Sequence, residues 1–411
     1  MYAALEPERW SLKSEACSLK PVMYPRSMRL AGVGIVLLVL ACRLATLFAT
    51  APAAAQQPAT TSAGAFESLR TQAEEARAGG RIDAAVALYQ QALALQPSWT
   101  EGYWSLGTIY YDADRHRECR DAFARVVEHE PAHGAAWAFR GLCEFRLKEY
   151  APALEHLNRA RQLGVGDASE FQAVVGYHRA LLLARAEQFE RAFDVDAAFV
   201  RGGNASPEIL EALGIAMLHV ARLPSELTAE ERDMVQLAGR AGALSIGMER
   251  AAADKAFVEL VSRYGGSRNV HFVYGNFLAS DHPEEALGQF KSEIGQFPDN
   301  AHAHVQIAQE LIKQGDFDAA TPYATKAAKL APRNYLARKV LGQVKLQQGD
   351  ASGAIVELEA ARTLEPSSPS VRFQLARAYQ RAGRAADATR ERAEFKRLEA
   401  QQQLQRGAAT P

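Results

Sequence analysis

The chain has 411 residues, of which 48% are hydrophobic, and its 47 basic and 48 acidic side chains nearly cancel. This composition is that of a folded chain rather than a disordered one. The near-neutral charge argues against nucleic acid as the main partner, because phosphate binding requires a concentrated excess of Lys and Arg.

The first 55 residues form a leader outside the expected fold. Met28 and Arg29 are followed by an apolar stretch over 30–41, and a run of three alanines ends at Ala55. A positive start, a short apolar centre and small residues at the end predict a secretory signal peptide over 28–55, cleaved after Ala55. The mature protein is then periplasmic or secreted. The alternative is an uncleaved leader that anchors the protein in the inner membrane, facing the periplasm.

Three further segments are expected to lie outside the fold. Residues 1–27 are interpreted as an upstream extension that results from a misplaced start codon. Residues 56–65 are rich in Pro, Ala, Thr and Ser, which is typical of a flexible linker. Residues 403–411 are expected to be a disordered tail.

A 34-residue repeat dominates the rest of the chain. Small residues recur at the eighth position of each unit, and large apolar residues recur at the twenty-fourth. Examples of such pairs are Gly107 with Phe123, Gly141 with Leu157 and Gly342 with Leu358. A proline near the end of the unit recurs at the same 34-residue interval. One group of these prolines is Pro97 and Pro131, and the other is Pro298, Pro332 and Pro366.

The repeat has a simple physical interpretation. Apolar residues recur at three- and four-residue steps, as they do on one face of a helix. Small residues let two helices approach closely, and large residues fill the space between them. Glycines near the middle of the units divide each unit into two helices, and proline starts the next connection because a helix interior does not tolerate it. One helix pair cannot bury its apolar face alone, so the pairs must stack.

This pattern resembles the tetratricopeptide repeat (TPR). The closest match is the run Tyr103-Trp104-Ser105-Leu106-Gly107, followed by Tyr110, Phe123 and Pro131. The resemblance implies an all-α fold, a right-handed α-solenoid of stacked helix-turn-helix repeats. Nine helix pairs are predicted, beginning near Phe66, Thr100, Gly134, Ala173, Thr228, Ser267, Ala301, Tyr335 and Pro369.

The array is interrupted after Pro207, which begins a first helix that no second helix follows. Thr228 and Glu231 then form a capping box that opens a new helix. The last helix is rich in Arg, Glu and Gln, as a solvated cap should be. The predicted organisation is an N-terminal array over 66–206, an unpaired helix and joint over 207–228, and a C-terminal array over 229–402.

Two cysteines, Cys119 and Cys143, lie outside the leader. We expect them to be small apolar core residues, because a disulfide has strict geometric requirements. A disulfide is the alternative in an oxidising compartment.

One string resembles a catalytic motif. His129-Glu130-Pro131-Ala132-His133 matches the HExxH pattern of zinc proteases, which requires both histidines on one continuous helix. Pro131 would break that helix, and the chain has no Gly-rich phosphate loop, nucleophile elbow or Cys-x-x-Cys pair. We therefore expect no catalytic residue, no metal site and no cofactor. Arg140 and Glu144, four residues apart, are expected to form an ion pair along one helix.

The resemblance also implies that the first helices line a concave surface. Aromatic side chains at positions outside the core are enriched where partners dock. The alternative is that these rings pack against neighbouring helices. Histidines on adjacent first helices are more often groove residues than metal ligands. The candidate partner-binding residues are Trp104, Thr108, Tyr111, Leu142, Phe145, Tyr177, His271 and His302.

These features predict an exported TPR scaffold that holds a peptide or helix of a partner protein in its concave groove. The alternative is a non-catalytic assembly subunit of a cell-envelope machine, for pili, secretion or outer-membrane biogenesis, that binds through its convex face or its ends. An enzyme is disfavoured. We expect a protein or peptide partner, no nucleic acid and no small-molecule substrate, with membrane contact only through an uncleaved leader.

Overall fold

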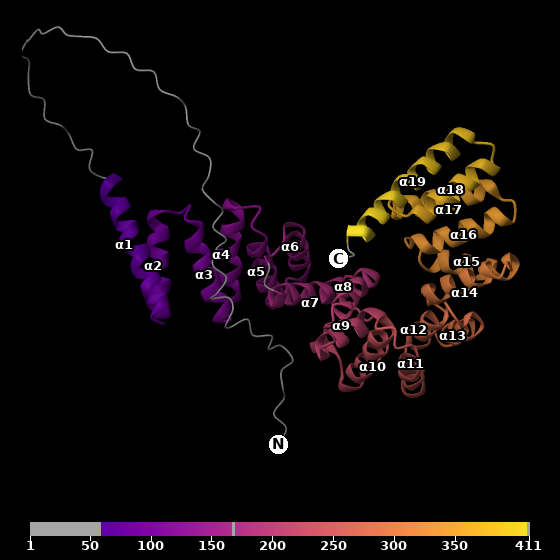
Figure 1. The fold of residues 1–411 in the computed structure, drawn as a ribbon, viewed down its shortest axis with the longest axis horizontal. Helices are drawn as coiled ribbons and strands as arrows, with labels where there is room; N and C mark the ends of the chain where they lie inside the picture. Colours follow the sequence, from indigo (N-terminus) through magenta and orange to yellow (C-terminus); the bar gives the residue numbers. More distant parts are fainter. Residues whose placement is uncertain (1–58, 167–168, 409–411) are drawn as a thin grey trace, which may run out of the picture. The chain divides into compact units, whose positions relative to one another are not determined.

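A computed structural model describes residues 59–166 and 169–408, where nineteen α-helices and one short 3-10 turn make up the regular structure (Figure 1). The predicted all-α architecture is therefore confirmed. The chain divides into two compact units, one ending at Leu183 and the other beginning at Ala184. The predicted leader lies outside the described residues. None of the described helices is long and apolar enough to cross a membrane.

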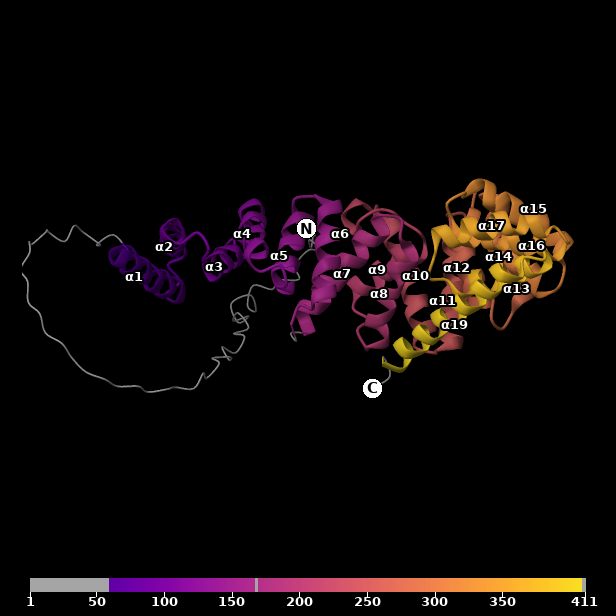
Figure 2. The ribbon, with the colours of Figure 1, turned by 90° about the horizontal axis from the view of Figure 1, so that it is seen from above.

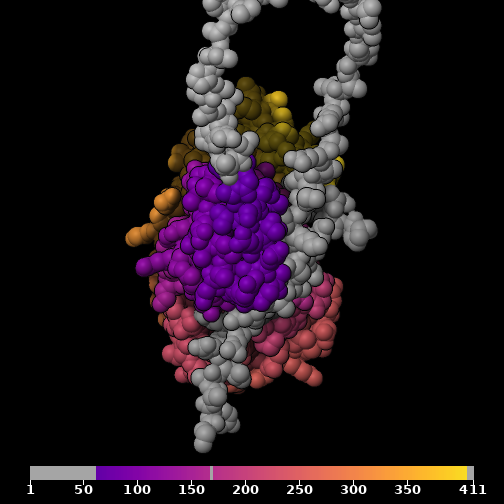
Figure 3. Space-filling view, turned by 90° about the vertical axis from the view of Figure 1, so that its left-hand side faces the viewer, coloured from indigo at the N-terminus to yellow at the C-terminus, as the bar shows by residue number. Residues whose placement is uncertain are grey.

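The first unit consists of three helix pairs and most of a seventh helix. Each second helix packs on its own first helix and on the first helix of the next pair, so one apolar core extends from Phe66 to Leu182. Figure 3 shows how the side chains of the first pair, in indigo, close into a continuous surface. The helices are α1 (Ala59–Ala78), α2 (Ile82–Leu95), α3 (Thr100–Asp112), α4 (His116–His129), α5 (Gly134–Arg146), α6 (Tyr150–Leu163) and α7 (Ser169–Arg185).

The second unit begins in the last turn of α7 and extends to the last helix. Helices that follow each other in the chain again pack against each other (Figure 2). Its helices are α8 (Phe189–Arg201), α9 (Pro207–Met217), α10 (Ala229–Ile246), α11 (Arg250–Tyr264), α12 (Val270–Leu278), α13 (Pro283–Gln296), α14 (Ala301–Lys313), α15 (Phe317–Leu330), α16 (Tyr335–Gln347), α17 (Ala351–Leu364), α18 (Pro369–Arg381) and α19 (Ala385–Ala408).

The close approach predicted between eighth and twenty-fourth positions is observed in both units. A Cβ added to Gly107 would lie 2.7 Å from Cε2 of the Phe123 ring. A Cβ added to Gly342 would lie 2.6 Å from Cγ of Leu358. Protein cores are packed too densely to accommodate such overlaps without movement. The small residue therefore sets the distance between the two helices of each pair.

The turn inside most helix pairs places one residue in the left-handed conformation, at the fifteenth position of the repeat, and the α12–α13 turn over 279–282 is an exception. Glycine at this position adopts φ values between 70° and 87°, and other residues adopt φ values between 56° and 64°. Glycine adopts this conformation freely, whereas an L-residue pays about 1–2 kcal/mol for it. The position therefore imposes one backbone geometry on different residue types. The glycines are Gly80, Gly315, Gly349 and Gly383, and the other residues are Asp114, Lys148, Glu187 and Met248.

A recurring hydrogen bond that the sequence did not predict joins consecutive repeats. The fourth residue of a first helix donates to the carbonyl of the proline that ends the preceding repeat. The residue types are dissimilar, but each carries an N–H group at the end of a long side chain. The pairs are Trp137 with Pro131 (2.9 Å), His304 with Pro298 (3.0 Å), Arg338 with Pro332 (3.0 Å) and Arg372 with Pro366 (3.1 Å).

Helix α9 is not unpaired, so this part of the prediction is wrong. It packs against α10, where a Cβ added to Gly214 or to Gly239 would lie 1.9 or 1.8 Å from a carbonyl oxygen of the other helix. Glycines on both helices allow this backbone contact, which the repeat pattern does not contain. The capping box at Thr228 is confirmed: its amide N lies 2.9 Å from Glu231 Oε2, and Glu231 N lies 3.2 Å from Thr228 Oγ1. The chain divides inside α7 rather than at 207–228.

The first and last helices are longer than predicted. Helix α1 begins at Ala59, inside the expected linker. Helix α19 continues to Ala408, into the expected tail. Residues 62–65 and 399–404 are exposed, so these parts of the two helices add no core.

Cys119 on α4 and Cys143 on α5 form a disulfide, with 6.3 Å between their Cα atoms. Both residues are completely buried. The expectation of two core residues is correct for their burial and wrong for the bond. Packing of a second helix on the next first helix brings the two cysteines within the Cα separation that a disulfide requires. The bond therefore links two consecutive repeats covalently.

Candidate protein-binding surfaces

Three of the eight predicted groove residues are buried. Trp104, Thr108 and Leu142 expose only 6%, 0% and 2% of their surface. The Trp104 ring packs edge-on against Phe139 of the next first helix, with 5.7 Å between ring centroids, and Thr108 accepts a hydrogen bond from Arg77 at 3.0 Å. The side chains at the fifth and ninth positions of these first helices are thus covered by neighbouring first helices. The prediction that these three side chains project into a groove is wrong.

Three other predicted residues, Tyr111, Phe145 and Tyr177, are half-buried and lie on the successive first helices α3, α5 and α7. Phe145 packs edge-on against His178 (4.8 Å between centroids), and Tyr177 also contacts His178 (5.3 Å). Tyr111 occupies the same repeat position as Phe145 and leans on Phe139 (5.2 Å). We call Tyr111, Phe145, Tyr177 and His178 the aromatic row.

The sequence analysis missed His178, although it directly follows Tyr177. Its Nδ1 lies 2.8 Å from the carbonyl oxygen of Val174, one turn earlier on α7. This hydrogen bond fixes the imidazole between Phe145 and Tyr177. A ring held in this way is a rigid part of the surface.

The Tyr111 phenol of the aromatic row carries no charge near neutral pH. Burial raises the pKa of Tyr111 to about 12, an effect that the positive charge of Arg146 partly offsets. The Tyr111 phenol is therefore protonated and can donate a hydrogen bond. Burial, together with Arg146, lowers the pKa of the nearby His116. The row thus offers aromatic surface and a hydroxyl donor.

The predicted ion pair between Arg140 and Glu144 is confirmed. Arg140 Nε lies 3.1 Å from Glu144 Oε1, and His156 Nδ1 lies 2.6 Å from the other carboxylate oxygen. Glu144 is only 2% exposed. Both oxygens have partners, so this carboxylate stabilises the α5–α6 pair.

The two predicted histidines of the second unit make separate contacts. Nδ1 of His271 on α12 lies 2.6 Å from Gln289 Oε1 on α13. His302 on α14 packs edge-on against His219, with 4.7 Å between ring centroids. His219, which the sequence analysis missed, follows α9 and stacks in parallel on Phe189 at 4.6 Å.

We call His219, His302, Phe189 and Phe272 the histidine cluster. Phe272 completes it, with its ring centroid 5.5 Å from that of His219 and 6.1 Å from that of His302. Burial, together with a smaller effect of the neighbouring His302, lowers the pKa of His219 to about 3. Burial also lowers the pKa of His302. Both imidazoles are therefore neutral near pH 7 and behave as aromatic surface.

The HExxH string lies across a helix break, as predicted. Helix α4 ends at His129 and α5 begins at Gly134. His133 caps α5 by accepting a hydrogen bond from Ala136 N at 3.3 Å, and the His129 ring packs on Tyr103. In the part of the chain that the structure describes, no group of three or more His, Cys, Asp or Glu side chains is arranged to hold a metal ion.

Three family models match segments of the chain. A model described as tetratricopeptide repeat matches residues 105–168 and 305–369, a second described as TPR repeat matches 74–114, and a third described as tetratricopeptide repeat matches 345–404. The matched segments lie in both compact units. These segments are therefore TPR repeats.

Similarity to individual proteins is more limited. Protein NPGR1 of Arabidopsis thaliana is 36% identical over 92 residues, which cover 22% of this chain and 13% of that protein. Among solved structures, MamA AMB-1 is 18% identical with a TM-score of 0.34, covering 39% of this chain and 96% of that one. MamA 41-end from Desulfovibrio magneticus RS-1 is 16% identical with a TM-score of 0.37, covering 41% and 96%.

Proposed function

We propose that this chain, with TPR repeats in both of its units, is an exported scaffold that binds a peptide or helix of a partner protein on the first helices of its repeats. In the first unit the aromatic row provides the main apolar contact. The protein is not an enzyme in this proposal. It acts by holding its partner.

The aromatic row carries the proposal, because half-buried rings on three successive first helices are costly to leave in water. Rings that are held in place and partly exposed are typical anchors of protein interfaces, where Tyr and Trp are enriched. The buried Trp104 and Leu142 lie on the same helices and make the base of the row rigid. Such a base reduces the entropy that the surface loses when a partner binds.

The spacing of the row restricts the shape of the partner. Packed helices are about 8–10 Å apart, so successive rings repeat at roughly that interval. Seven residues of α-helix cover about 10.5 Å, and three residues of extended chain cover about 10 Å. An amphipathic helix with apolar residues every seven positions therefore fits the row, as does an extended segment with apolar residues every three.

Export is supported by two independent observations. The sequence has the pattern of a signal peptide over 28–55. The buried Cys119–Cys143 disulfide is of a kind that persists in the periplasm or outside the cell and is rare in the cytosol. A mature N-terminus at Gln56 and an oxidised disulfide in protein taken from the envelope are the expected results.

The binding proposal is tested with the double variant Tyr111→Ala/Phe145→Ala in affinity purification from envelope extracts. We expect loss of at least about tenfold in the amount of the main partner, because each lost aromatic anchor weakens binding by about 1–2 kcal/mol. Tyr103→Ala is the matched control, since Tyr103 is also half-buried on α3 but packs on His129, away from the row.

Circular dichroism establishes that each variant is folded. Full recovery of the partner with the double variant would remove the aromatic row from consideration. If cross-links to the partner then map to α19 or to residues 207–228, the chain instead acts through its ends, as an assembly subunit of an envelope machine.

A further inference from the structure

The last four helices carry an excess of positive charge. Residues 335–404 contain twelve Lys and Arg side chains and eight Asp and Glu side chains, a formal charge of +4, whereas the whole chain has a charge of -1. The cations of this region differ in what they bind. Some pair with carboxylates and others contact only neutral oxygens.

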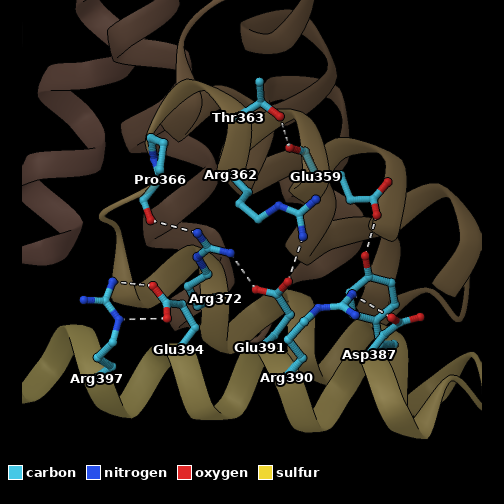
Figure 4. A network of polar contacts seen from close by, with 11 residues as sticks. Glu359, Arg362, Thr363, Pro366, Arg372, Asp387, Arg390, Glu391, Glu394 and Arg397 are labelled. Carbon is cyan, nitrogen blue, oxygen red and sulfur yellow. Dashed lines mark hydrogen bonds and ion pairs between the residues drawn. The ribbon is translucent and has the colours of Figure 1, made fainter.

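Several local carboxylates are paired with the first group of cations (Figure 4). Glu391, only 1% exposed, accepts from Arg362 at 2.7 Å and from Arg372 at 3.0 Å. Two cations of the preceding repeat converge on Glu357 in the same way. The pairs are Arg338 and Lys345 with Glu357, Arg384 and Arg390 with Asp387, and Arg397 with Glu394.

Lys339 and Arg377 belong to the second group. Lys339 Nζ lies 3.5 Å from Ser370 Oγ, and Arg377 Nη1 lies 3.3 Å from Gln374 Oε1. Within the described residues 59–166 and 169–408, neither side chain forms an ion pair. Burial lowers the pKa of Lys339, and no carboxylate offsets this effect. These cations lack an internal counter-charge.

The two cations flank an exposed aromatic ring. Ser370, Phe373 and Arg377 lie at i, i+3 and i+7, on one face of α18, and Lys339 reaches that face from α16. Phe373 is 45% exposed, and the Arg377 guanidinium lies 5.9 Å from its ring centroid. Seven residues of helix separate the two ends of this face by about 10.5 Å. We call Lys339, Phe373 and Arg377 the cationic strip.

We propose that the cationic strip binds an acidic segment of a partner protein, with one carboxylate on Lys339, a second on Arg377 and an apolar side chain of the segment on Phe373. This inference rests on the proposed function as a protein-binding scaffold and names the chemistry of a second contact. Two partly desolvated cations beside a ring match a short acidic and apolar segment. A nucleic acid backbone would require a broader array of cations.

The test measures fluorescence anisotropy of labelled peptides with the full mature chain. The probe is a peptide of Glu-Leu-Ser repeats, whose carboxylates recur every three residues, and the neutral control is the same peptide with Gln for Glu. In low salt, we expect the acidic probe to bind at least about tenfold more tightly than the neutral control peptide. Lys339→Gln and Arg377→Gln should each weaken it about fivefold, in keeping with about 1 kcal/mol per ion pair.

Arg390→Gln is the matched control, because it removes one charge from the same region but from a cation paired with Asp387, and it should leave the affinity unchanged. Equal losses in all three variants would mean that only net charge matters and would overturn the proposal. So would tighter binding of a single-stranded DNA or of phosphatidylglycerol vesicles with the same dependence on Lys339 and Arg377. Concentration-dependent dimerisation that Lys339→Gln abolishes would instead identify a second copy as the occupant.

These results are separable from those on the aromatic row. If Tyr111→Ala/Phe145→Ala loses its partner while Lys339→Gln and Arg377→Gln bind the acidic probe like the unmodified protein, the proposed function stands and this inference fails. If the acidic probe binds as expected while the aromatic double variant retains its partner, the reverse holds.

Discussion

Apart from the hydrogen bond to the proline carbonyl, which occurs in both, the two compact units connect their repeats by different means. In the first unit, apolar and covalent contacts join α4 to α5: the Phe123 and Phe139 rings stack in parallel at 4.9 Å, and a buried disulfide lies in the same core. In the second unit, a buried polar network joins α12, α13 and α14. Glu293, with no exposed surface, accepts from Asn269 N and from Asn300 Nδ2, both at 2.8 Å.

The polar network also extends to the end of α9, where Asn269 Nδ2 donates to Leu218 O at 2.8 Å. The comparison shows that the repeat geometry and the chemistry of its joints are independent. Small residues at the eighth position and a left-handed turn at the fifteenth recur in both units. Neighbouring helices of different repeats are joined by an aromatic stack, a disulfide or a hydrogen-bonded carboxylate. The following predictions test this difference.

Replacing Glu293 with alanine should have the largest effect. The change leaves the buried amide of Asn269 without its acceptor and removes one of the two acceptors of Asn300 Nδ2, at a cost of about 3–4 kcal/mol. Hydrogen exchange of peptides from α12 to α14 is the measurement, because it reports stability locally. Exposed Glu285, replaced by alanine, is the control and should cost less than about 0.5 kcal/mol. Equal exchange in the two variants would show that the network contributes nothing.

Loss of the disulfide should destabilise the first unit selectively. Cys119→Ala/Cys143→Ala removes a link between residues 24 positions apart and should cost about 2–3 kcal/mol. Hydrogen exchange should increase in α3 to α6 and remain unchanged in α14 to α19. If exchange rises equally in both units, the disulfide stabilises more than the repeats it joins.

The histidine cluster should make the second unit sensitive to acid. The folded-state pKa of His219, about 3, lies below its unfolded value of about 6.5, so the unfolded state binds more protons between these values. Stability is fully present above pH 6.5 and is lost as the pH falls toward 3. Lowering the pH from 7.5 to 5.5 should reduce the contribution of His219 to the free energy of unfolding by about 1 kcal/mol.

His302 titrates beside His219, and Glu190 acts on His302 in the opposite direction, so the comparison must be between variants. His219→Asn, which tolerates the left-handed backbone at this residue, should show a smaller loss over the same pH range in urea unfolding of the second unit. An unchanged pH profile would assign the acid sensitivity to other groups.

The smallest effects are expected at the fifteenth position. Gly349→Ala should destabilise the second unit by about 1 kcal/mol, because alanine must adopt φ near 87°. Lys148→Gly relieves the same conformation in the first unit and should stabilise it by about 0.5 kcal/mol after the entropy of the unfolded chain is counted. Thermal unfolding of both variants measures whether each substitution lowers or raises the stability. Two shifts of the same sign would show that the turn geometry is not shared.

Much of the fold could be predicted from the chain. The Gly107–Phe123 contact and the helix break at Pro131 follow from residue size and from the missing amide of proline. The pairing of α9 with α10 could not be predicted, because Gly239 lies outside the repeat pattern and meets Gly214 only when the two helices cross. The candidate site was predicted in part. Register placed Tyr111 and Phe145 on the first helices, but it did not reveal that the next first helix covers Trp104.

By itself the sequence determined the repeat, its helices and the residues that set the spacing between paired helices, because these depend on period and side-chain volume within about 34 neighbouring residues. Only the tertiary structure decided how the repeats are joined and which side chains remain exposed. The disulfide of Cys119 with Cys143, the burial of Glu293 and the unpaired charges of Lys339 and Arg377 depend on contacts between different repeats. A pattern that is the same in every repeat contains no information about such contacts.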